Sequence, residues 1–324
     1  MQRARSFREL VARVKKLGMG RFLVDDLLPA RSLAILAGDS GLGKSALAYQ
    51  LAMCIAAGHD FLDRRVRQGR VVILDYENGL QQMMQLCRSL RDHLSLPRVP
   101  EDFRLWSYND SELGDEGQKE IRRLVTRERP ALVVIDSLTG YAPDVEEKTA
   151  NAIRCLQELR QLMKTIDCSV LAIHHLRKPT NDHTPAPLGT GRMREWFHRV
   201  RGAGALINAT DVRLGVDVPS AASSEDAALV FGGFLRVRGE IPPLMLSRDQ
   251  DGRGEPLGYS LLTREDLLPK FQRKKYKLLP KEFTFKQGKN IYAKGDQATH
   301  DFLQKCMTLG ILRQEKRRGV YRKI

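Results

Sequence analysis

"LAILAGDSGLGKSALAYQLA", residues 33–52, joins an apolar run to a helical pattern through a glycine-rich turn. The turn matches G-x-x-x-x-G-K-[ST], the phosphate loop, whose glycines let backbone N–H groups approach phosphate oxygens closely. The helix that follows adds the positive end of its dipole to the anion site. A glycine turn with a solvated lysine is the alternative, and the strand–turn–helix context disfavours it. The predicted nucleotide-binding residues are Gly38, Asp39, Ser40, Gly41, Leu42, Gly43, Lys44 and Ser45.

The residue types in this loop indicate which part of a bound nucleotide each residue contacts. We expect Lys44 to reach the β- and γ-phosphates and Ser45 to place its hydroxyl on Mg²⁺. The chain has no N-K-x-D motif, and "DSLTG" (136–140) is not the D-x-x-G of GTPases. The sequence therefore favours ATP over GTP, with Mg²⁺ as the metal.

Composition limits the class of protein. With 324 residues, 42% of them hydrophobic, the chain is long enough for one large α/β domain and a small one. It has no run of 18 or more apolar residues, so we expect no membrane contact. The five cysteines are odd in number and show no C-x-x-C spacing, which favours core thiols in a reducing cytoplasm.

The net charge of +15 is unevenly distributed along the chain. Residues 270–324 carry 16 Lys and Arg against 4 Asp and Glu, so most of the excess lies in this tail. A strongly basic tail favours an anionic polymer as its partner.

Apolar runs alternate with helical patterns along the first two thirds of the chain. The runs after the phosphate loop are "GRVVILDYE" (69–77), "FRLWSY" (103–108), "ALVVIDSL" (131–138) and "CSVLAIHH" (168–175). Strands that alternate with helices predict a mostly parallel sheet covered on both faces. After residue 200, "DVRLGVDV", "ALVFGGFLRVRG" and "PLMLSRD" predict antiparallel additions at one sheet edge. An amphipathic pattern over residues 7–17 predicts a helix before the first strand.

Polar residues close three of these runs, at the sheet edge where open α/β folds bind ligands. Asp136 is placed to hold Mg²⁺ beside the phosphate loop. Glu77 is placed to polarise the attacking water, with Asp75 as a nearby competitor. One of His174 and His175 could contact the γ-phosphate, whereas a core histidine bonded to a backbone carbonyl is the alternative.

Two stretches without periodicity, residues 139–149 and 177–200, follow strands at this same edge. In the second and at the residue just after it, the cations of Arg192, Arg194, Arg199 and Arg201 interleave with Trp196 and Phe197. Cations and stacking faces suit a flexible single strand of DNA. A solvated basic loop with one buried aromatic pair is the alternative.

The tail has a separate pattern. A helix over 283–293, a second over 297–310 and a basic hairpin with Gly319 at its tip resemble a winged helix-turn-helix. In that arrangement Gln297, Thr299 and His300 begin the recognition helix. Lys316, Arg317 and Arg318 lie on the wing and would contact phosphates. Docking of a protein by the same fold is the alternative, and the charge favours duplex DNA.

The order of the phosphate loop, "LDYENG", "LVVIDSL", "LAIHHLRK" and "RGAGALINATDVRL" resembles the RecA-like ATPases. Within them it is most similar to the RepA-type hexameric replicative helicases of plasmids and phages, over residues 20 to about 250. The resemblance implies that Glu77 is the catalytic base, that Asp136 is the metal-side carboxylate, and that a histidine senses the γ-phosphate. The family pattern has an aspartate after the glutamate, where this chain has Asn78.

The resemblance also implies an oligomer, a hexameric ring or a filament, in which a neighbouring subunit completes each site with a basic residue. Four candidates match the relevant segments: Arg201, Arg213, Arg236 and Arg238. It further implies that the two aperiodic loops line a central channel that grips single-stranded DNA.

The sequence thus predicts a RecA-like α/β fold with an N-terminal helical segment (1–20), an ATPase domain (21–265) and a winged-helix domain (266–324). The expected function is that of a DNA-dependent ATPase, a helicase or translocase in the cytoplasm. One alternative is a DNA-bound ATPase that does not unwind DNA, such as a loader, mediator or regulator. A second is a P-loop kinase of a small molecule.

Overall fold

The computed structural model describes most of the chain. The described residues are 6–16, 21–108, 117–177, 186, 188–189, 193–202, 204–219, 229–252, 256–315 and 319–324.

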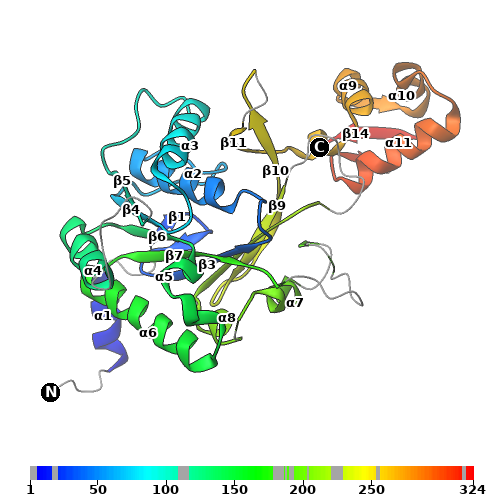
Figure 1. Cartoon of the computed structure of the whole chain (residues 1–324). Coiled ribbons are helices and arrows are strands. Elements are labelled where there is room, and N and C mark those ends of the chain that lie inside the picture. Colours follow the sequence, from blue (N-terminus) through cyan, green and yellow to red (C-terminus); the bar gives the residue numbers. More distant parts are fainter. Residues whose placement is uncertain are drawn as a thin grey trace.

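A nine-stranded sheet forms the centre of the molecule (Figure 1). Its parallel strands are β3 (Leu33–Gly38), β4 (Val71–Asp75), β5 (Phe103–Ser107), β6 (Leu132–Asp136), β7 (Ser169–His175) and β8 (Val212–Asp217). The antiparallel strands are β9 (Leu229–Leu235), β10 (Gly239–Gln250) and β11 (Pro256–Leu261). The strand order is β11-β10-β9-β8-β3-β7-β6-β4-β5.

Helices cover both faces of this sheet (Figure 1). On one face α2 (Lys44–Ala57) and α3 (Leu80–His93) pack on residues such as Leu36 and Ile73. Alternate residues such as Val72 point to the other face, where they meet α4 (Gly117–Glu128) and α6 (Thr149–Ile166). Shorter elements on that face are α5 (Leu138–Tyr141), η1 (Pro143–Glu146), α7 (Met193–Trp196), η2 (Phe197–Arg199) and α8 (Gly204–Ala209). The predicted mostly parallel sheet with helices on both faces is confirmed.

One strand runs in the opposite direction to the prediction. β8 was expected among the antiparallel additions, but it pairs parallel to β3, with Ala34 opposite Val212. The connection from β7 passes over the sheet through α7, η2 and α8, and such a crossover returns the chain in its original direction. The antiparallel part of the sheet therefore begins one strand later, at β9.

Smaller elements lie at the two ends of the chain. At the amino end, α1 (Phe7–Lys16) confirms the predicted helix, and β1 (Phe22–Val24) pairs with β2 (Leu28–Pro29). After η3 (Arg264–Leu267), the tail contains α9 (Lys270–Leu278), α10 (Phe285–Tyr292) and α11 (Asp296–Thr308). Its sheet has the order β12 (Glu282–Thr284), β14 (Val320–Lys323), β13 (Leu312–Gln314), and its own apolar cluster includes Tyr276, Phe302 and Leu303.

All five cysteines are free and buried, as expected for core thiols. Within the described residues, no helix has the length and hydrophobicity that a bilayer crossing requires.

Candidate active site

The phosphate loop connects β3 to α2 at the carboxyl edge of the parallel strands. Gly41 and Gly43 have φ values of 79° and 82°, a left-handed conformation that favours glycine. Gly43 has a second constraint, because a Cβ there would lie 2.0 Å from the hydroxyl oxygen of Tyr259 on β11. That hydroxyl donates to the Leu42 carbonyl oxygen at 3.3 Å, so the antiparallel extension contacts the phosphate loop directly.

Lys44 is buried within this loop and is 5% exposed. Its ammonium group donates to the Asp39 carbonyl oxygen at 2.8 Å. Burial lowers the pKa of Lys44, while the carboxylates of Asp136, Glu77 and Asp39 oppose that change. The cation is thus held among acidic groups at the place where phosphates would bind.

Asp136 ends β6, and its carboxylate is almost completely buried. Neither of its oxygens has a hydrogen-bond partner among the described residues. Burial raises the pKa of Asp136 to about 7, with Asp75 and Glu77 adding to the rise and Ser45 and Lys44 opposing it. Two buried oxygens without donors fit a hard cation, because Mg²⁺ binds through carboxylates, a loop hydroxyl, water and phosphates. Asp136 and Ser45 could therefore hold it, as predicted from the sequence.

Glu77 follows β4. His175 lies between its carboxylate and the phosphate loop and contacts both. The Nε2 atom of His175 donates to Glu77 Oε1 at 3.2 Å, and its Nδ1 lies 3.4 Å from the Ser40 hydroxyl. This contact with His175 lowers the pKa of Glu77 to about 2. Glu77 is therefore ionised at neutral pH and connected to the loop by one histidine.

The two histidines of β7 face opposite sides of the sheet, as neighbouring strand residues do. His174 is fully buried, and its Nε2 donates to the Arg201 carbonyl oxygen at 3.0 Å. Burial lowers the pKa of His174, which favours the neutral ring. Of the two sequence candidates, only His175 contacts a residue of the phosphate loop.

Asp75, the competitor of Glu77, has a structural position that the sequence did not reveal. Its buried carboxylate accepts from the backbone N–H groups of Glu77 and Asn78, at 2.9 and 2.7 Å. The Asn78 amide donates to it at 2.8 Å, and the Tyr49 hydroxyl on α2 also donates to it. An aspartate at position 78 would place a second carboxylate against Asp75, which explains the asparagine in this chain. The carboxylate of Asp75 is therefore taken up by hydrogen bonds that hold the Glu77 loop.

This arrangement predicts an effect for Tyr49→Phe. Loss of a hydrogen bond to a buried carboxylate is expected to destabilise the protein by about 1.5–3 kcal/mol and to lower ATP turnover, with little change in KM for ATP. Tyr76→Phe is the matched control, because the Tyr76 hydroxyl is buried without a partner among the described residues. Thermal unfolding and steady-state turnover measure both variants. Equal stabilities of the two would contradict the role of the Tyr49–Asp75 bond.

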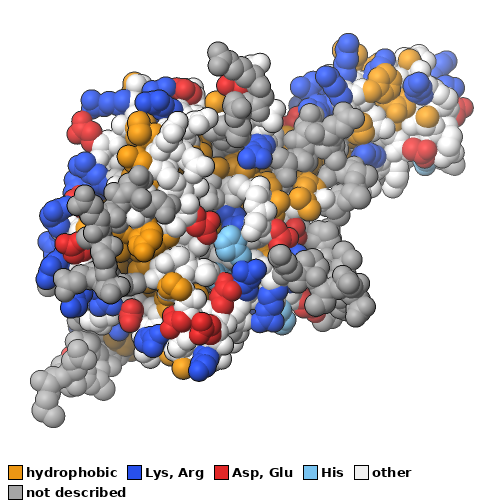
Figure 2. Space-filling model, viewed as in Figure 1, with side chains coloured by type: hydrophobic (Ala, Val, Ile, Leu, Met, Phe, Trp, Pro, Cys, Tyr) orange, Lys and Arg blue, Asp and Glu red, His pale blue; other side chains and the backbone are white. Residues whose placement is uncertain are grey.

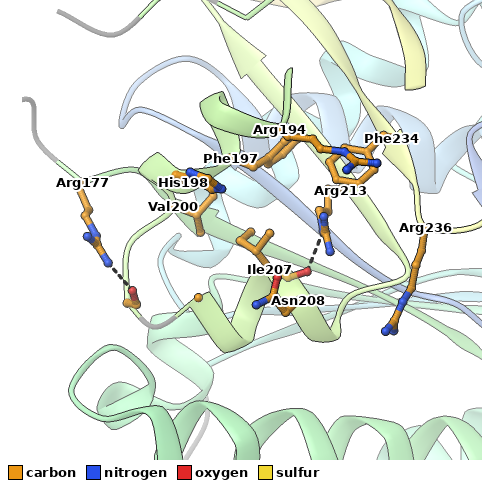
Figure 3. A pocket seen from close by; sticks show the side chains of 12 residues that line it. Arg177, Arg194, Phe197, His198, Val200, Ile207, Asn208, Arg213, Phe234 and Arg236 are labelled. Carbon is orange, nitrogen blue, oxygen red and sulfur yellow. Dashed lines mark hydrogen bonds between the residues drawn. The ribbon is translucent and has the colours of Figure 1, made fainter. Parts of the chain in front are cut away.

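The four candidate arginines for a neighbouring site have different environments. Arg213 donates to the Ile207 carbonyl oxygen at 2.7 Å and stacks 4.4 Å from the Phe234 ring centroid (Figure 3). Arg236 points into the same region (Figure 3), whereas Arg201 lies 3.7 Å from Glu146. Arg238 is in the turn between β9 and β10, its side chain is 57% exposed, and it pairs with Asp26 at 3.2 Å.

In the second aperiodic loop, the aromatic residues lie in the core. Trp196 is 4% exposed, and its indole N–H donates to Asp217 at 2.7 Å. A Cβ at Gly215 would lie 2.6 Å from the Trp196 ring, so this residue packs directly on the sheet. Arg199 is 16% exposed and pairs with Asp39 and Asp217. Burial and pairing do not favour these two residues as DNA contacts; Arg194 is exposed, and Arg192 lies outside the described residues.

The predicted DNA contacts of the tail are placed unequally. On α11, Gln297 and His300 are exposed, whereas Thr299 is fully buried and its hydroxyl donates to the Gly295 carbonyl oxygen at 2.9 Å. Lys316, Arg317 and Arg318 lie outside the described residues. Burial of Thr299 does not favour it as a base contact.

Comparison with known proteins identifies a family and solved structures that resemble this chain. No match was found among curated protein sequences. A KaiC-like protein of the hyperthermophilic archaeon Pyrococcus horikoshii OT3 superposes with a TM-score of 0.48 and 14% identity, covering 74% of this chain and 94% of that one. A family model described as "AAA domain" matches residues 19–181, half of the chain, including the phosphate loop, Glu77, Asp136 and both histidines. The chain therefore belongs to the AAA-domain family, as a P-loop ATPase with an α/β fold.

Proposed function

We propose that this ATPase is DNA-dependent, of the RecA/RepA type, and that it acts as a helicase or translocase in DNA replication or recombination. The observation that carries the ATP chemistry is the convergence of Lys44, Asp136 and Glu77 at one sheet edge. Lys44 binds the β- and γ-phosphates, and backbone N–H groups of the loop surround them. Asp136 and Ser45 would hold Mg²⁺, which would neutralise phosphate charge.

Glu77 orients the attacking water. A carboxylate whose pKa is about 2 is a weak proton acceptor, but phosphoryl transfer depends mainly on positioning and charge stabilisation. His175 fixes the carboxylate of Glu77 and contacts Ser40, so it connects the water-binding group to the phosphate loop. Loss of the γ-phosphate would therefore change the contacts of His175, and so affect β7 and the loop that follows it.

A cationic cavity supports DNA as the partner of this loop. It has a volume of about 490 Å³, and Arg177, Arg194, Arg213 and Arg236 line it without any carboxylate among the described lining residues (Figure 3). Burial lowers the pKa of Arg213, and the charges of Arg236 and Arg194 lower it further. An anion such as a backbone phosphate would relieve this repulsion. We propose that single-stranded DNA binds here, with Arg194 as the exposed contact from the predicted set.

The tail is proposed to be a winged-helix domain that binds duplex DNA. Its positive charge is concentrated on α9, which carries Lys270, Arg273, Lys274, Lys275 and Lys277, and Figure 2 shows Lys and Arg side chains gathered on this part of the tail. The proposed recognition helix α11 is slightly negative by comparison, since its Asp296 and Asp301 outnumber Lys305. We therefore propose phosphate contacts from α9 in addition to base contacts from Gln297 and His300.

Removal of residues 270–324 tests the DNA dependence. We expect single-stranded DNA to stimulate ATP hydrolysis by the full chain, and the truncation to lower duplex affinity by about tenfold or more at moderate salt. The slope of log affinity against log salt should fall by about 0.9 for each phosphate that the truncated protein no longer neutralises. Hydrolysis without DNA should survive, because the phosphate loop, Glu77 and Asp136 precede the deletion. Turnover that ignores DNA but requires a small acceptor would favour a kinase instead.

We also propose a homo-oligomer, a hexamer or a filament, in which Arg238 acts on the neighbouring site. The turn that carries Arg238 lies at the amino-terminal edge of the sheet, where Leu235 pairs with Val212, so it cannot reach the phosphate loop of its own chain. The adjacent Val237 is 93% exposed, which suits a contact with another copy. Free, buried thiols on all five cysteines are consistent with the cytoplasm as the compartment.

Mixing inactive chains tests this proposal. Arg238→Ala alone should lower turnover by about a thousandfold, because a cation that stabilises the transition state is removed. Lys44→Ala chains retain Arg238, so adding them to Arg238→Ala chains should restore turnover at mixed interfaces. A mixture of Lys44→Ala and Glu77→Gln chains is the control, since both changes affect groups of the same site. A fully active monomer at every dilution would refute the shared site.

A further inference from the structure

The amino-terminal edge of the sheet contains a second cationic cavity, of about 530 Å³, which we term the basal cavity. The segments that form it lead into the starts of β1, β3, β4, β6 and β7. Because β3 has six residues, this edge is about 20 Å from the phosphate loop at the other end of the same strand. The basal cavity is therefore separate from the nucleotide site. Its charged lining residues are Arg21, Arg31, Arg67, Arg70, Arg129 and Asp167.

Positive charge in the basal cavity is only partly compensated. Arg31 pairs with Asp167, and Arg70 pairs with Asp102 and Glu128 outside the cavity. Arg21, Arg67 and Arg129 are exposed and have no carboxylate within ion-pair distance among the described residues. Among the described lining residues, arginines from separate segments of the chain thus share the cavity with one carboxylate, an arrangement that attracts anions.

One guanidinium nitrogen in the basal cavity lacks an acceptor, although the other two nitrogens of that side chain contact Asp167. The Nη1 atom of Arg31 is buried and has no hydrogen-bond partner among the described residues. Buried donors are nearly always satisfied, so an orphaned one indicates an acceptor that the protein itself does not supply. A ligand oxygen in the cavity would complete the hydrogen bonds of Arg31.

The backbone holds two of these arginines in a costly conformation. Arg31 and Arg129 have φ values of 61° and 47°, in the left-handed region that residues other than glycine seldom adopt. Such conformations concentrate at functional sites, where the surrounding structure maintains them. Glycine at either position would relieve the strain but would remove a guanidinium from the basal cavity.

The lining residues also define the chemistry of the ligand. The guanidinium fork matches phosphate oxygens in bidentate geometry. The described lining has no aromatic side chain, so it offers no stacking face for a base. We propose that the basal cavity binds phosphate groups, supplied either by a free polyphosphate compound or by the backbone of a nucleic acid strand.

The experiment measures binding to the Lys44→Ala chain, in which the phosphate loop is disabled. The probes are inorganic pyrophosphate and a single-stranded oligothymidylate, each titrated at one fixed salt concentration. Arg67→Gln with Arg129→Gln removes two exposed cations of the basal cavity. Arg65→Gln with Arg98→Gln is the matched control, with the same charge change at exposed positions outside it.

We expect the variant with Arg67→Gln and Arg129→Gln to bind one probe about tenfold more weakly than the parent. The control variant should bind that probe less than about twofold more weakly. A loss confined to the oligonucleotide identifies a nucleic acid backbone, and a loss of pyrophosphate binding identifies a free polyphosphate. Equal behaviour of cavity and control variants with both probes would overturn the proposal. If the double variant misfolds by circular dichroism, Arg67→Lys and Arg129→Lys, which keep the charge but lose the fork, should still weaken the same probe.

Discussion

Glu77→Gln is expected to lower ATP turnover by about a hundredfold or more while ATP still binds. Glutamine fills the same space and leaves Lys44, Ser45 and Asp136 unchanged, so the phosphate cradle remains intact. It removes the charge that orients the attacking water, and it loses the charge-assisted bond from His175, which is 3.2 Å long in the native chain. Fluorescent nucleotide binding and single-turnover hydrolysis separate the two effects.

The control for this variant is Glu146→Gln, which makes the same change beside the other histidine, His174. Its turnover should remain much closer to that of the parent. The low pKa of Glu77 also predicts the pH profile: the carboxylate stays charged until the pH falls toward about 2. The stability that the Glu77 carboxylate contributes is fully present above its ordinary pKa of 4.5, and it is lost as the pH falls from 4.5 toward about 2. Parental turnover in Glu77→Gln would refute its assignment.

Lys44→Ala is expected to reduce turnover to background and to weaken nucleotide binding as well. The ammonium group is the buried cation among Asp136, Glu77 and Asp39, and its loss leaves the phosphate charge without its counter-ion. The remaining carboxylates would also repel the phosphates more strongly. Lys164→Ala, at an exposed position on α6, is the control and should bind nucleotide normally. Undiminished nucleotide binding by Lys44→Ala would contradict the assigned contact.

Local motifs allowed much of the fold and of the nucleotide site to be predicted from the sequence. The phosphate loop, Glu77 and Asp136 each end a buried strand, and parallel strands bring their carboxyl ends to one edge. The alternating pattern also predicted the strands around them. Each of these features could be recognised within one short stretch of the sequence.

Contacts between distant segments explain what the sequence could not predict. The choice between His174 and His175 depends on which side of β7 faces Ser40. The bond between Tyr49 and Asp75 joins two elements whose pairing no local pattern specifies. The basic residues around Trp196 in the sequence led to its prediction as a DNA contact. In the structure, contacts with Gly215 and Asp217 on β8 hold it in the core. The sequence signal for this contact was Asp217, a polar residue at the end of an apolar strand.

The contact of Tyr259 with the phosphate loop determines how the chain can be divided. The side chain of Gln50 on α2 is buried, and it bonds both the backbone N–H and the carbonyl oxygen of Tyr259 at 2.8 Å. The strand that supplies Tyr259 is the last one before the tail, far beyond the region that matches the AAA-domain family. A fragment cut at residue 181 would expose the back of the phosphate loop and leave Gln50 unsatisfied. The smallest autonomous catalytic fragment therefore has to extend through Leu261.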